Sequence, residues 1–414
     1  MAEIRGDAPI RVVITGMGAV SAAGWGVEPL WHALRAGRTG VGPFSRFDHS
    51  RQRTHLAGQV PPGPPKTFRR HPGWNRLAST DRFALFAALE AVKQAGLGRR
   101  LDEVTAGVFF GTSTGGLPEA EQFLEELWSS GGERGRLSHL ASHQLNAPGD
   151  AVARHLGATG PVFTVSSACA SAALALEDAL RSVRSGEVDL AVAGASDSLC
   201  TTTYSGFNSL RAVDEKPCRP FREGRSGMSL GEGSAVLVLE RLERALARGA
   251  EPLAELLGAG ASCDANHMTA PHPEGVGAAL AVSRGLEDAG IAAERIDFFN
   301  AHGTGTLLND ASEFSALSKV FGERASRIPV SATKSIVGHL LGSSGAIEAV
   351  ATILCLMAGE AHPAPGGGRV DPTTPVDLVL GEPRPLATGS IAVSASFGFG
   401  GANAAVVLGH WSRP

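Results

Sequence analysis

One cysteine has the surroundings of a nucleophile. Cys169 lies in the segment VSSACASAALAL (165–176), where small hydroxylated residues precede it and a good helix-forming stretch follows. A turn from a strand into a helix would direct backbone N–H groups and the positive helix end at its sulfur, which lowers the pKa of a thiol. A buried structural cysteine, the common role of a free cysteine, remains the alternative on this segment alone.

A second segment, NAHGTGTLLND (300–310), offers an imidazole and two hydroxyl groups. His302 follows an apolar strand and precedes glycines, which let the backbone approach a ligand closely. Thr304 and Thr306 alternate with those glycines and could contact a polar ligand. A solvated or capping histidine is the alternative.

A third segment, SATKSIVGHLLGSSGAIE (331–348), adds an amine, an imidazole and a carboxylate. Lys334 and His339 are five residues apart across a strand–helix junction, and Glu348 lies further along the helix. Open α/β folds place ligands beyond the carboxyl ends of their strands. We therefore expect these groups to converge with Cys169 at one edge of a sheet.

A fourth segment, SASFGFGGAN (394–403), alternates glycines with aromatic residues. Gly398 and Gly400 flank Phe399, a pattern that suits a backbone N–H pointing at an oxyanion while the ring gates a pocket. A glycine-rich turn with core phenylalanines is the alternative.

A competing motif lies near the start of the chain. GMGAVS (16–21) follows a strand and partly resembles a dinucleotide-binding fingerprint, but Ser21 stands where the third glycine belongs. No acidic residue ends a second strand about twenty positions later. A nicotinamide-dependent dehydrogenase is therefore disfavoured.

The elements that must position these groups alternate between strands and helices. Continuous apolar strands between helices predict parallel pairing with both faces covered. SSACASAALAL and GSSGAIEAVATIL both place serine and small residues before an apolar helix, which indicates a duplicated α/β unit. The expected strands are 10–21, 104–116, 161–167, 188–199, 296–306 and 328–335, and the expected helices 80–96, 169–186 and 338–359.

Composition narrows the functional class. The 414 residues include 37 basic and 41 acidic side chains, a net charge of −4 that argues against wholesale binding of nucleic acid. Five cysteines without a CxxC pair make a disulfide framework or a zinc site unexpected and fit a reducing compartment. We also expect no signal peptide and no membrane span.

With these motifs in order, the chain resembles the β-ketoacyl-acyl-carrier-protein synthases of type I/II nearly from end to end. The resemblance rests on VVITGMGAVS, SACAS, NAHGTGT, GHLLGSSGAIE and SFGFGGAN. It implies an α/β fold of the thiolase-like five-layered αβαβα type, with halves at 1–254 and 255–414. It also implies a cytoplasmic dimer without a bound cofactor or metal.

The resemblance further implies the reaction and the roles of its residues. An acyl group passes from a carrier protein to Cys169, and malonyl-carrier protein loses CO2 and attacks the acyl thioester. His302 and His339 would stabilise the enolate, and Lys334 with Glu348 would orient His302. The remaining roles are oxyanion hole and gate for Phe399, substrate contacts for Thr269, Thr304, Thr306, Phe207, Thr114, Gly398 and Gly400, and carrier-protein contacts for Lys66, Arg69, Arg70 and Arg211.

Three questions stay open at this level. Thr114 is smaller and more polar than the residue common in the family at this position. Such a side chain would leave room for a longer or less saturated acyl chain, so both polyketide and fatty-acid elongation stay open. The partner subunit is a second copy or a related chain. A non-catalytic chain-length factor has the same fold but typically lacks the cysteine, so Cys169 argues against that role.

Overall fold

The computed structural model describes residues 10–69 and 74–412. Most of its strands join one large sheet, and three short strand pairings flank the main elements. The strands are β1 (Val12–Ser21), β2 (Gly24–Trp25), β3 (Gly42–Pro43), β4 (Leu56–Ala57), β5 (Ala106–Gly111), β6 (Val162–Val165), β7 (Leu190–Asp197), β8 (Gly233–Arg241), β9 (Ala254–Cys263), β10 (Phe298–Asn300), β11 (Pro329–Ser331), β12 (Glu360–Ala361), β13 (Asp377–Leu378), β14 (Arg384–Pro385), β15 (Ile391–Phe397) and β16 (Ala402–His410).

Helices separate most of the long strands, as the sequence predicts, although β15 runs into β16 without an intervening α-helix. The helices are α1 (Val27–Arg35), α2 (Lys66–Arg69), α3 (Ser79–Gln94), α4 (Leu117–Ser129), α5 (Ala147–Leu156), α6 (Ser171–Ser185), α7 (Thr201–Ser209), α8 (Leu242–Ala247), α9 (Val276–Ala289), α10 (Leu307–Phe321), α11 (Lys334–Val337) and α12 (Ser344–Ala358).

The sheet is mixed, so the expectation of parallel pairing holds only in part. Its order is β13-β11-β10-β15-β16-β9-β1-β8-β7-β5-β6. Pairings near both ends are parallel, as between β5 and β7 or β10 and β15, whereas β7–β8, β8–β1, β9–β16 and β15–β16 are antiparallel. The antiparallel strands are also covered by helices on both faces, and their sequences are therefore as continuously apolar as those of parallel strands.

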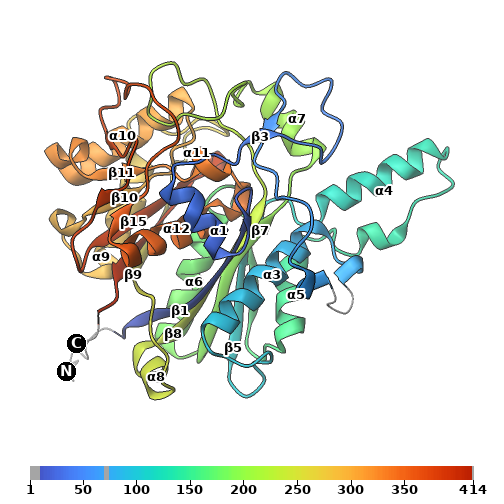
Figure 1. Ribbon diagram of the computed structural model, residues 1–414, viewed down its shortest axis with the longest axis horizontal. Coiled ribbons are helices and arrows are strands. Elements are labelled where there is room, and N and C mark those ends of the chain that lie inside the picture. Colours follow the sequence, from blue (N-terminus) through green and yellow to red (C-terminus); the bar gives the residue numbers. More distant parts are fainter. Residues whose placement is uncertain (1–9, 70–73, 413–414) are drawn as a thin grey trace.

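The elements stack in five layers, as the resemblance implies. α3 and α5 cover one outer face, α9 and α10 cover the other, and α6 and α12 lie between the two halves of the sheet (Figure 1). Contacts between β1 and β9 join the halves. The division at residues 254 and 255 falls within β9 and stays a prediction.

The central helices pack very closely. A Cβ at Gly345 in α12 would lie 3.0 Å from the backbone nitrogen of Ala173 in α6, so glycine permits this approach. Leu341–Ala358 has the length and composition of a membrane span, yet 89% of it is buried in the fold. Its apolar character follows from its position between two sheets.

This topology positions the predicted chemical groups. Cys169 follows β6, His302 follows β10, Lys334 and His339 follow β11, and Phe399 follows β15. These four strands are parallel members of the sheet's two halves, and their carboxyl ends open towards one cavity.

Candidate active site

Cys169 lies in a tight turn two residues before α6 begins. The preceding Ala168 has a φ of 47°, a left-handed conformation that non-glycine residues seldom adopt. The side chain is buried, and its Sγ lies 3.1 Å from Nε2 of His339. The structure thus places the sulfur against one of the two predicted imidazoles.

The predicted lowering of the thiol pKa is wrong for the resting site. Burial raises the pKa of Cys169 to about 11, although Lys334 and the backbone N–H groups of Phe399 and Cys169 act in the opposite direction. The backbone N–H groups favour the thiolate as expected, but the loss of hydration on burial outweighs them. The buried side chain of Cys169 is therefore a neutral thiol at neutral pH.

His339 donates rather than accepts at the nitrogen that faces the sulfur. Its Nδ1 accepts a hydrogen bond from the Leu341 N–H at 3.2 Å and lies 2.7 Å from Oγ of Ser344. Burial lowers the pKa of His339 well below its usual value, with a further contribution from Lys334, so the ring is neutral. A neutral imidazole whose Nδ1 accepts carries its proton on Nε2.

His302 is held in the same protonation state by a different partner. Its Nδ1 lies 3.1 Å from Nζ of Lys334. A protonated lysine can only donate, so the proton of the neutral imidazole is on Nε2. Burial, Lys334 and His339 all lower the pKa of His302. The two ring centroids are 5.5 Å apart.

Lys334 and Glu348 form a buried ion pair behind the imidazoles. Burial raises the pKa of Glu348 to about 7, while Lys334 acts against this rise. The pair fixes Nζ against His302 and lies too deep to touch a substrate itself, since both side chains are only 1% exposed. Their predicted supporting role fits this placement.

Phe399 contributes its backbone at the nucleophile and its ring at the pocket wall. Its N–H and that of Cys169 face the sulfur, the arrangement of an oxyanion hole. Gly398 permits this approach, because a Cβ there would lie 3.2 Å from the Cys169 nitrogen. The Phe399 ring lies 5.5 Å from the ring of Phe207.

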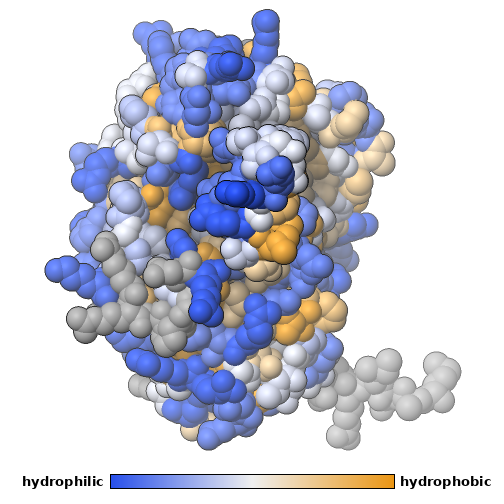
Figure 2. Space-filling view, turned by 90° about the vertical axis from the view of Figure 1, so that its right-hand side faces the viewer, coloured by the Kyte–Doolittle hydropathy of each residue, from blue (hydrophilic) through white to orange (hydrophobic). Residues whose placement is uncertain are grey.

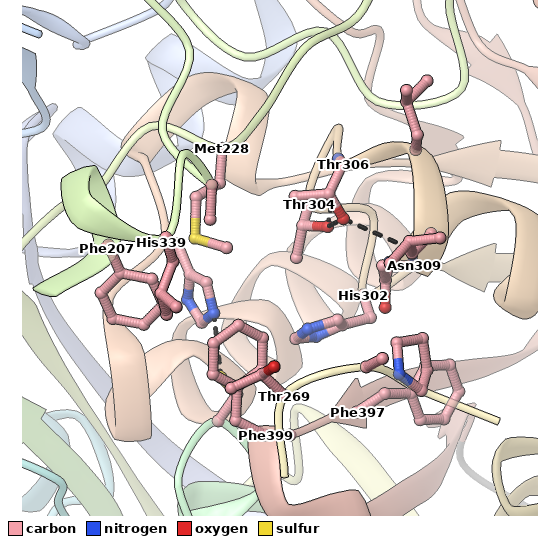
Figure 3. A pocket seen from close by; sticks show the side chains of 18 of the residues that line it. Phe207, Met228, Thr269, His302, Thr304, Thr306, Asn309, His339, Phe397 and Phe399 are labelled. Carbon is pink, nitrogen blue, oxygen red and sulfur yellow. Dashed lines mark hydrogen bonds between the residues drawn. The ribbon is translucent and has the colours of Figure 1, made fainter. Parts of the chain in front are cut away.

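A cavity of about 300 Å3 opens in front of the sulfur. Figure 3 shows His302 and His339 pointing towards each other across it, with Phe207 and Phe399 on one side. The hydroxyl groups of Thr304 and Thr306 form a hydrogen bond with each other, with their oxygens 2.9 Å apart. The other lining residues predicted from the sequence are Cys169, Thr269, Gly398 and Arg211.

Two predicted substrate contacts lie away from this cavity. Thr114 is buried, and its Oγ1 donates to the carboxylate of Asp197 at 2.8 Å. Gly400 has a φ of 82°, and its N–H donates to the Met268 carbonyl, which anchors the loop that carries Phe399. Direct contact of either residue with a substrate stays a prediction.

The predicted carrier-protein contacts come from two stretches of the chain, 66–70 and 211. Arg211 is exposed and lines the cavity mouth. Lys66 is exposed at the start of α2, which ends at Arg69. Arg70 lies outside the described residues.

Sequence reasoning missed two buried carboxylates that shape the His302 loop. Glu313 accepts hydrogen bonds from the His302 and Gly303 N–H groups at 2.7 and 2.8 Å. Asp310 accepts a hydrogen bond from the Gly305 N–H. Burial raises the pKa of Glu313 to about 8 and that of Asp310 to about 6. Their position in NDASE, directly after the glycine-rich loop, was the available signal.

The three central side chains resemble a metal site only in their spacing. Among the described residues, the ligand atoms of Cys169, His302 and His339 lie within 4.8 Å of one another. Both Nε2 atoms carry protons in the hydrogen-bonded state derived above, so neither has a free lone pair for a cation. The donor set fits an oxyanion better than a metal.

Comparison with known proteins agrees with this arrangement. Residues 10–245 match the family model "Beta-ketoacyl synthase, N-terminal domain", and residues 253–366 match "Beta-ketoacyl synthase, C-terminal domain".

Relatives and a solved structure extend the match over the whole chain. A 3-oxoacyl-[acyl-carrier-protein] synthase 2 of Synechocystis is 38% identical over 95% of this chain and 96% of its own. A chloroplastic 3-oxoacyl-[acyl-carrier-protein] synthase I of Hordeum vulgare is 36% identical, over 96% and 88%. The ishigamide ketosynthase/chain length factor superposes with a TM-score of 0.92 at 36% identity, covering 98% of this chain and 100% of that chain. The chain therefore belongs to the β-ketoacyl synthase family.

Proposed function

We propose that this chain condenses an acyl group held on Cys169 with malonyl-carrier protein and yields a β-ketoacyl-carrier protein. One observation carries the proposal most directly. Cys169 Sγ and the protonated Nε2 atoms of His302 and His339 meet in one cavity beside two backbone N–H groups. This arrangement combines a nucleophile with stabilisation of two different oxyanions.

Acyl loading is the first step. The Cys169 sulfur attacks the thioester carbonyl of the incoming acyl carrier, and the N–H groups of Cys169 and Phe399 stabilise the resulting oxyanion. The carbon–sulfur bond to the carrier then breaks, and the proton of the Cys169 thiol leaves with the carrier thiol. The acyl group remains on the enzyme.

Decarboxylation and condensation follow at the same place. The malonyl thioester loses CO2, and its oxygen becomes negatively charged as the enolate forms. The Nε2–H groups of His302 and His339 donate to that oxygen. The enolate carbon attacks the acyl-Cys169 carbonyl, a carbon–carbon bond forms, and the Cys169 sulfur leaves as a thiolate, which takes a proton from solvent to restore the thiol.

The cavity wall provides contacts for a phosphopantetheine arm. Thr269, Thr304 and Thr306 present hydroxyl groups along the route from the surface to the sulfur. Leu210 and Leu307 are 56% and 61% exposed at its mouth, so the carrier protein would meet an apolar rim next to Arg211. This rim gives the acyl carrier protein both apolar and basic contacts.

A dimer is the proposed assembly. β6 is an edge strand in the described part of the sheet, with Val162 and Phe163 40% and 50% exposed. α4 projects from the body, and its Trp128 is 74% exposed (Figure 1). Figure 2 views this side of the molecule, where apolar surface appears among hydrophilic side chains. Such an uncovered edge favours pairing with another chain.

The second candidate is the catalytic half of a heterodimer, in which a related chain takes the place of the second copy. The likeness to the ishigamide ketosynthase/chain length factor favours it. Co-expression with candidate subunits, followed by mass measurement of the native complex, distinguishes the two assemblies. We place the protein in a reducing compartment, the cytoplasm, because its five cysteines are free.

Purified protein with acyl- and malonyl-carrier protein tests the function. A product two carbons longer, together with an acyl group on Cys169 in the mass spectrum, supports condensation. If the acyl- and malonyl-carrier proteins stay unchanged with the homodimer and also with every co-expressed partner, the proposed condensation activity is overturned.

A further inference from the structure

The carbonyl group of Ala168, next to the nucleophile, is held by two serine hydroxyl groups. Oγ of Ser171 donates to this oxygen at 2.7 Å, and Oγ of Ser113 donates to it at 3.2 Å. The Ser171 N–H adds a third contact at 3.2 Å. Two side chains from separate elements thus converge on a single backbone oxygen.

The geometry of a peptide bond connects this oxygen to the oxyanion hole. The carbonyl of Ala168 and the N–H of Cys169 belong to the same planar unit and point in opposite directions. Holding the oxygen on one side therefore directs the Cys169 N–H to the other side, where it faces Sγ. Because Ala168 has a φ of 47°, this orientation needs support from its surroundings.

Both serines are themselves anchored. Oγ of Ser171 also accepts a hydrogen bond from the Ser167 N–H at 2.8 Å, so it bridges the turn on both sides. The Ser113 N–H donates to the buried carboxylate of Asp197 at 2.9 Å. Asp197 also accepts hydrogen bonds from Thr112 and Thr114, which fixes the loop after β5 beneath the turn.

We propose that Ser171 and Ser113 are positioning residues that direct the Cys169 N–H into the oxyanion hole. This inference rests on the proposed function, because the hole matters only when a thioester carbonyl reacts at Cys169. Neither hydroxyl touches the substrate in this scheme. Both act through the 168–169 peptide bond.

The test compares two reactions of the same sulfur. Transfer of an acyl group from acyl-carrier protein forms an oxyanion, whereas alkylation by iodoacetamide is a displacement that leaves the reagent's carbonyl unreacted. In Ser171→Ala we expect acyl transfer to fall by about 10–100-fold, a smaller effect than the loss of an oxyanion donor itself. Alkylation should stay within about threefold, since the Cys169 N–H makes the smallest contribution to the pKa of the sulfur and His339 is unchanged.

Three further variants complete the design. Ser171→Thr keeps the hydroxyl and should restore most of the acyl transfer. Ser113→Ala should also lower acyl transfer without changing alkylation, but by a smaller factor than Ser171→Ala. Ser234→Ala is the matched control, because Ser234 is equally buried and donates to the carbonyl of Ala195 in β7, away from the turn. It should leave both reactions unchanged.

The outcomes separate this inference from the proposed function. Equal loss of transfer and alkylation in Ser171→Ala, or unchanged transfer in a folded Ser171→Ala, overturns the positioning role. If Ser171→Ala does not fold by circular dichroism, Ser113→Ala carries the test on the same criteria. Wild-type protein that alkylates but transfers no acyl group would instead contradict the proposed function.

Discussion

The two halves of the molecule bring similar junctions to one site and use them differently. The turn before α6 and the turn before α12 each contain a non-glycine residue in the left-handed region, Ala168 with φ 47° and Leu341 with φ 52°. Each also has a buried serine at the helix start, Ser171 and Ser344.

The difference lies in what each serine holds. Ser171 binds a backbone carbonyl, and its junction presents a sulfur and an N–H group. Ser344 lies against Nδ1 of His339, and its junction presents a protonated Nε2. One half thus presents the sulfur and a backbone donor and the other presents the imidazole donors, so under the proposed function substitutions in each half should affect different steps.

Removal of the sulfur gives the largest effect and breaks the comparison at the first junction. We expect Cys169→Ser to abolish acyl loading, because a buried hydroxyl is a far weaker nucleophile than sulfur. Cys169→Gln should still decarboxylate malonyl-carrier protein, since both imidazoles remain. Mass spectra of the enzyme measure acyl loading, and release of CO2 from labelled malonyl-carrier protein measures decarboxylation. Loss of decarboxylation in Cys169→Gln would contradict the separation of the loading step from the decarboxylation step.

Removal of either imidazole breaks the comparison on the side of the second half, where His339 belongs to the junction before α12 and His302 follows β10. His302→Ala or His339→Ala should reduce decarboxylation by about 10²–10³-fold, the usual cost of losing one donor to an oxyanion. Acyl loading should fall less in His302→Ala, because His302 has no hydrogen bond to Sγ among those described, whereas His339 does. Equal defects in both steps for both variants would show that the division of labour is wrong.

Lys334→Met tests how His302 is oriented. It removes the donor to Nδ1, so the imidazole can shift its proton from Nε2 to Nδ1. We expect decarboxylation to fall about 10–100-fold, by analogy with the loss of a hydrogen-bond partner behind a metal-ligating histidine, which also fixes the tautomer of the ring. Lys319→Met, at an exposed position of α10, is the control and should be silent. Both variants need melting temperatures, because Lys334→Met also leaves Glu348 unpaired.

The pH dependence of alkylation sharpens the contrast between sulfur and imidazole. Because burial raises the pKa of Cys169 to about 11, reaction of iodoacetamide at this residue should rise about tenfold per pH unit between pH 7 and 10. A simple thiol with a pKa of about 8.5 levels off within this range and serves as the reference. A plateau near pH 8 at Cys169 would restore the lowered pKa expected from the helix end alone.

The smallest effect is expected at Ser344. Ser344→Ala removes one partner of His339 Nδ1, but the Leu341 N–H still donates to that nitrogen. A single buried hydrogen bond contributes about 1 kcal/mol, so decarboxylation should fall by no more than roughly fivefold. A loss as large as that in His339→Ala would mean that the serine, and not the backbone, sets the tautomer.

The predictable parts of this site were those carried by residue type and local spacing. Cys169, His302, His339 and Lys334 each lie in a segment that follows a strand, and the topology brings these segments together. The resemblance to the synthases supplied the order of the layers. Periodicity alone did not distinguish antiparallel from parallel strands, because helices bury both kinds on both faces.

What the sequence could not provide depends on three-dimensional enclosure. The sign of the shift in the Cys169 pKa follows from desolvation, which no local pattern reports. Glu313 acts eleven residues from His302 through backbone N–H groups, and Thr114 faces Asp197 instead of the cavity. Each of these follows from tertiary packing.

The raised pKa of the central thiol has a consequence for the protein's durability. Peroxides oxidise thiolates, and oxidation beyond the sulfenic acid is largely irreversible. A sulfur that stays protonated because it is buried is poorly reactive towards such oxidants. Burial thus makes the Cys169 sulfur a weaker nucleophile, and it also protects this sulfur from irreversible oxidation, which would inactivate the enzyme.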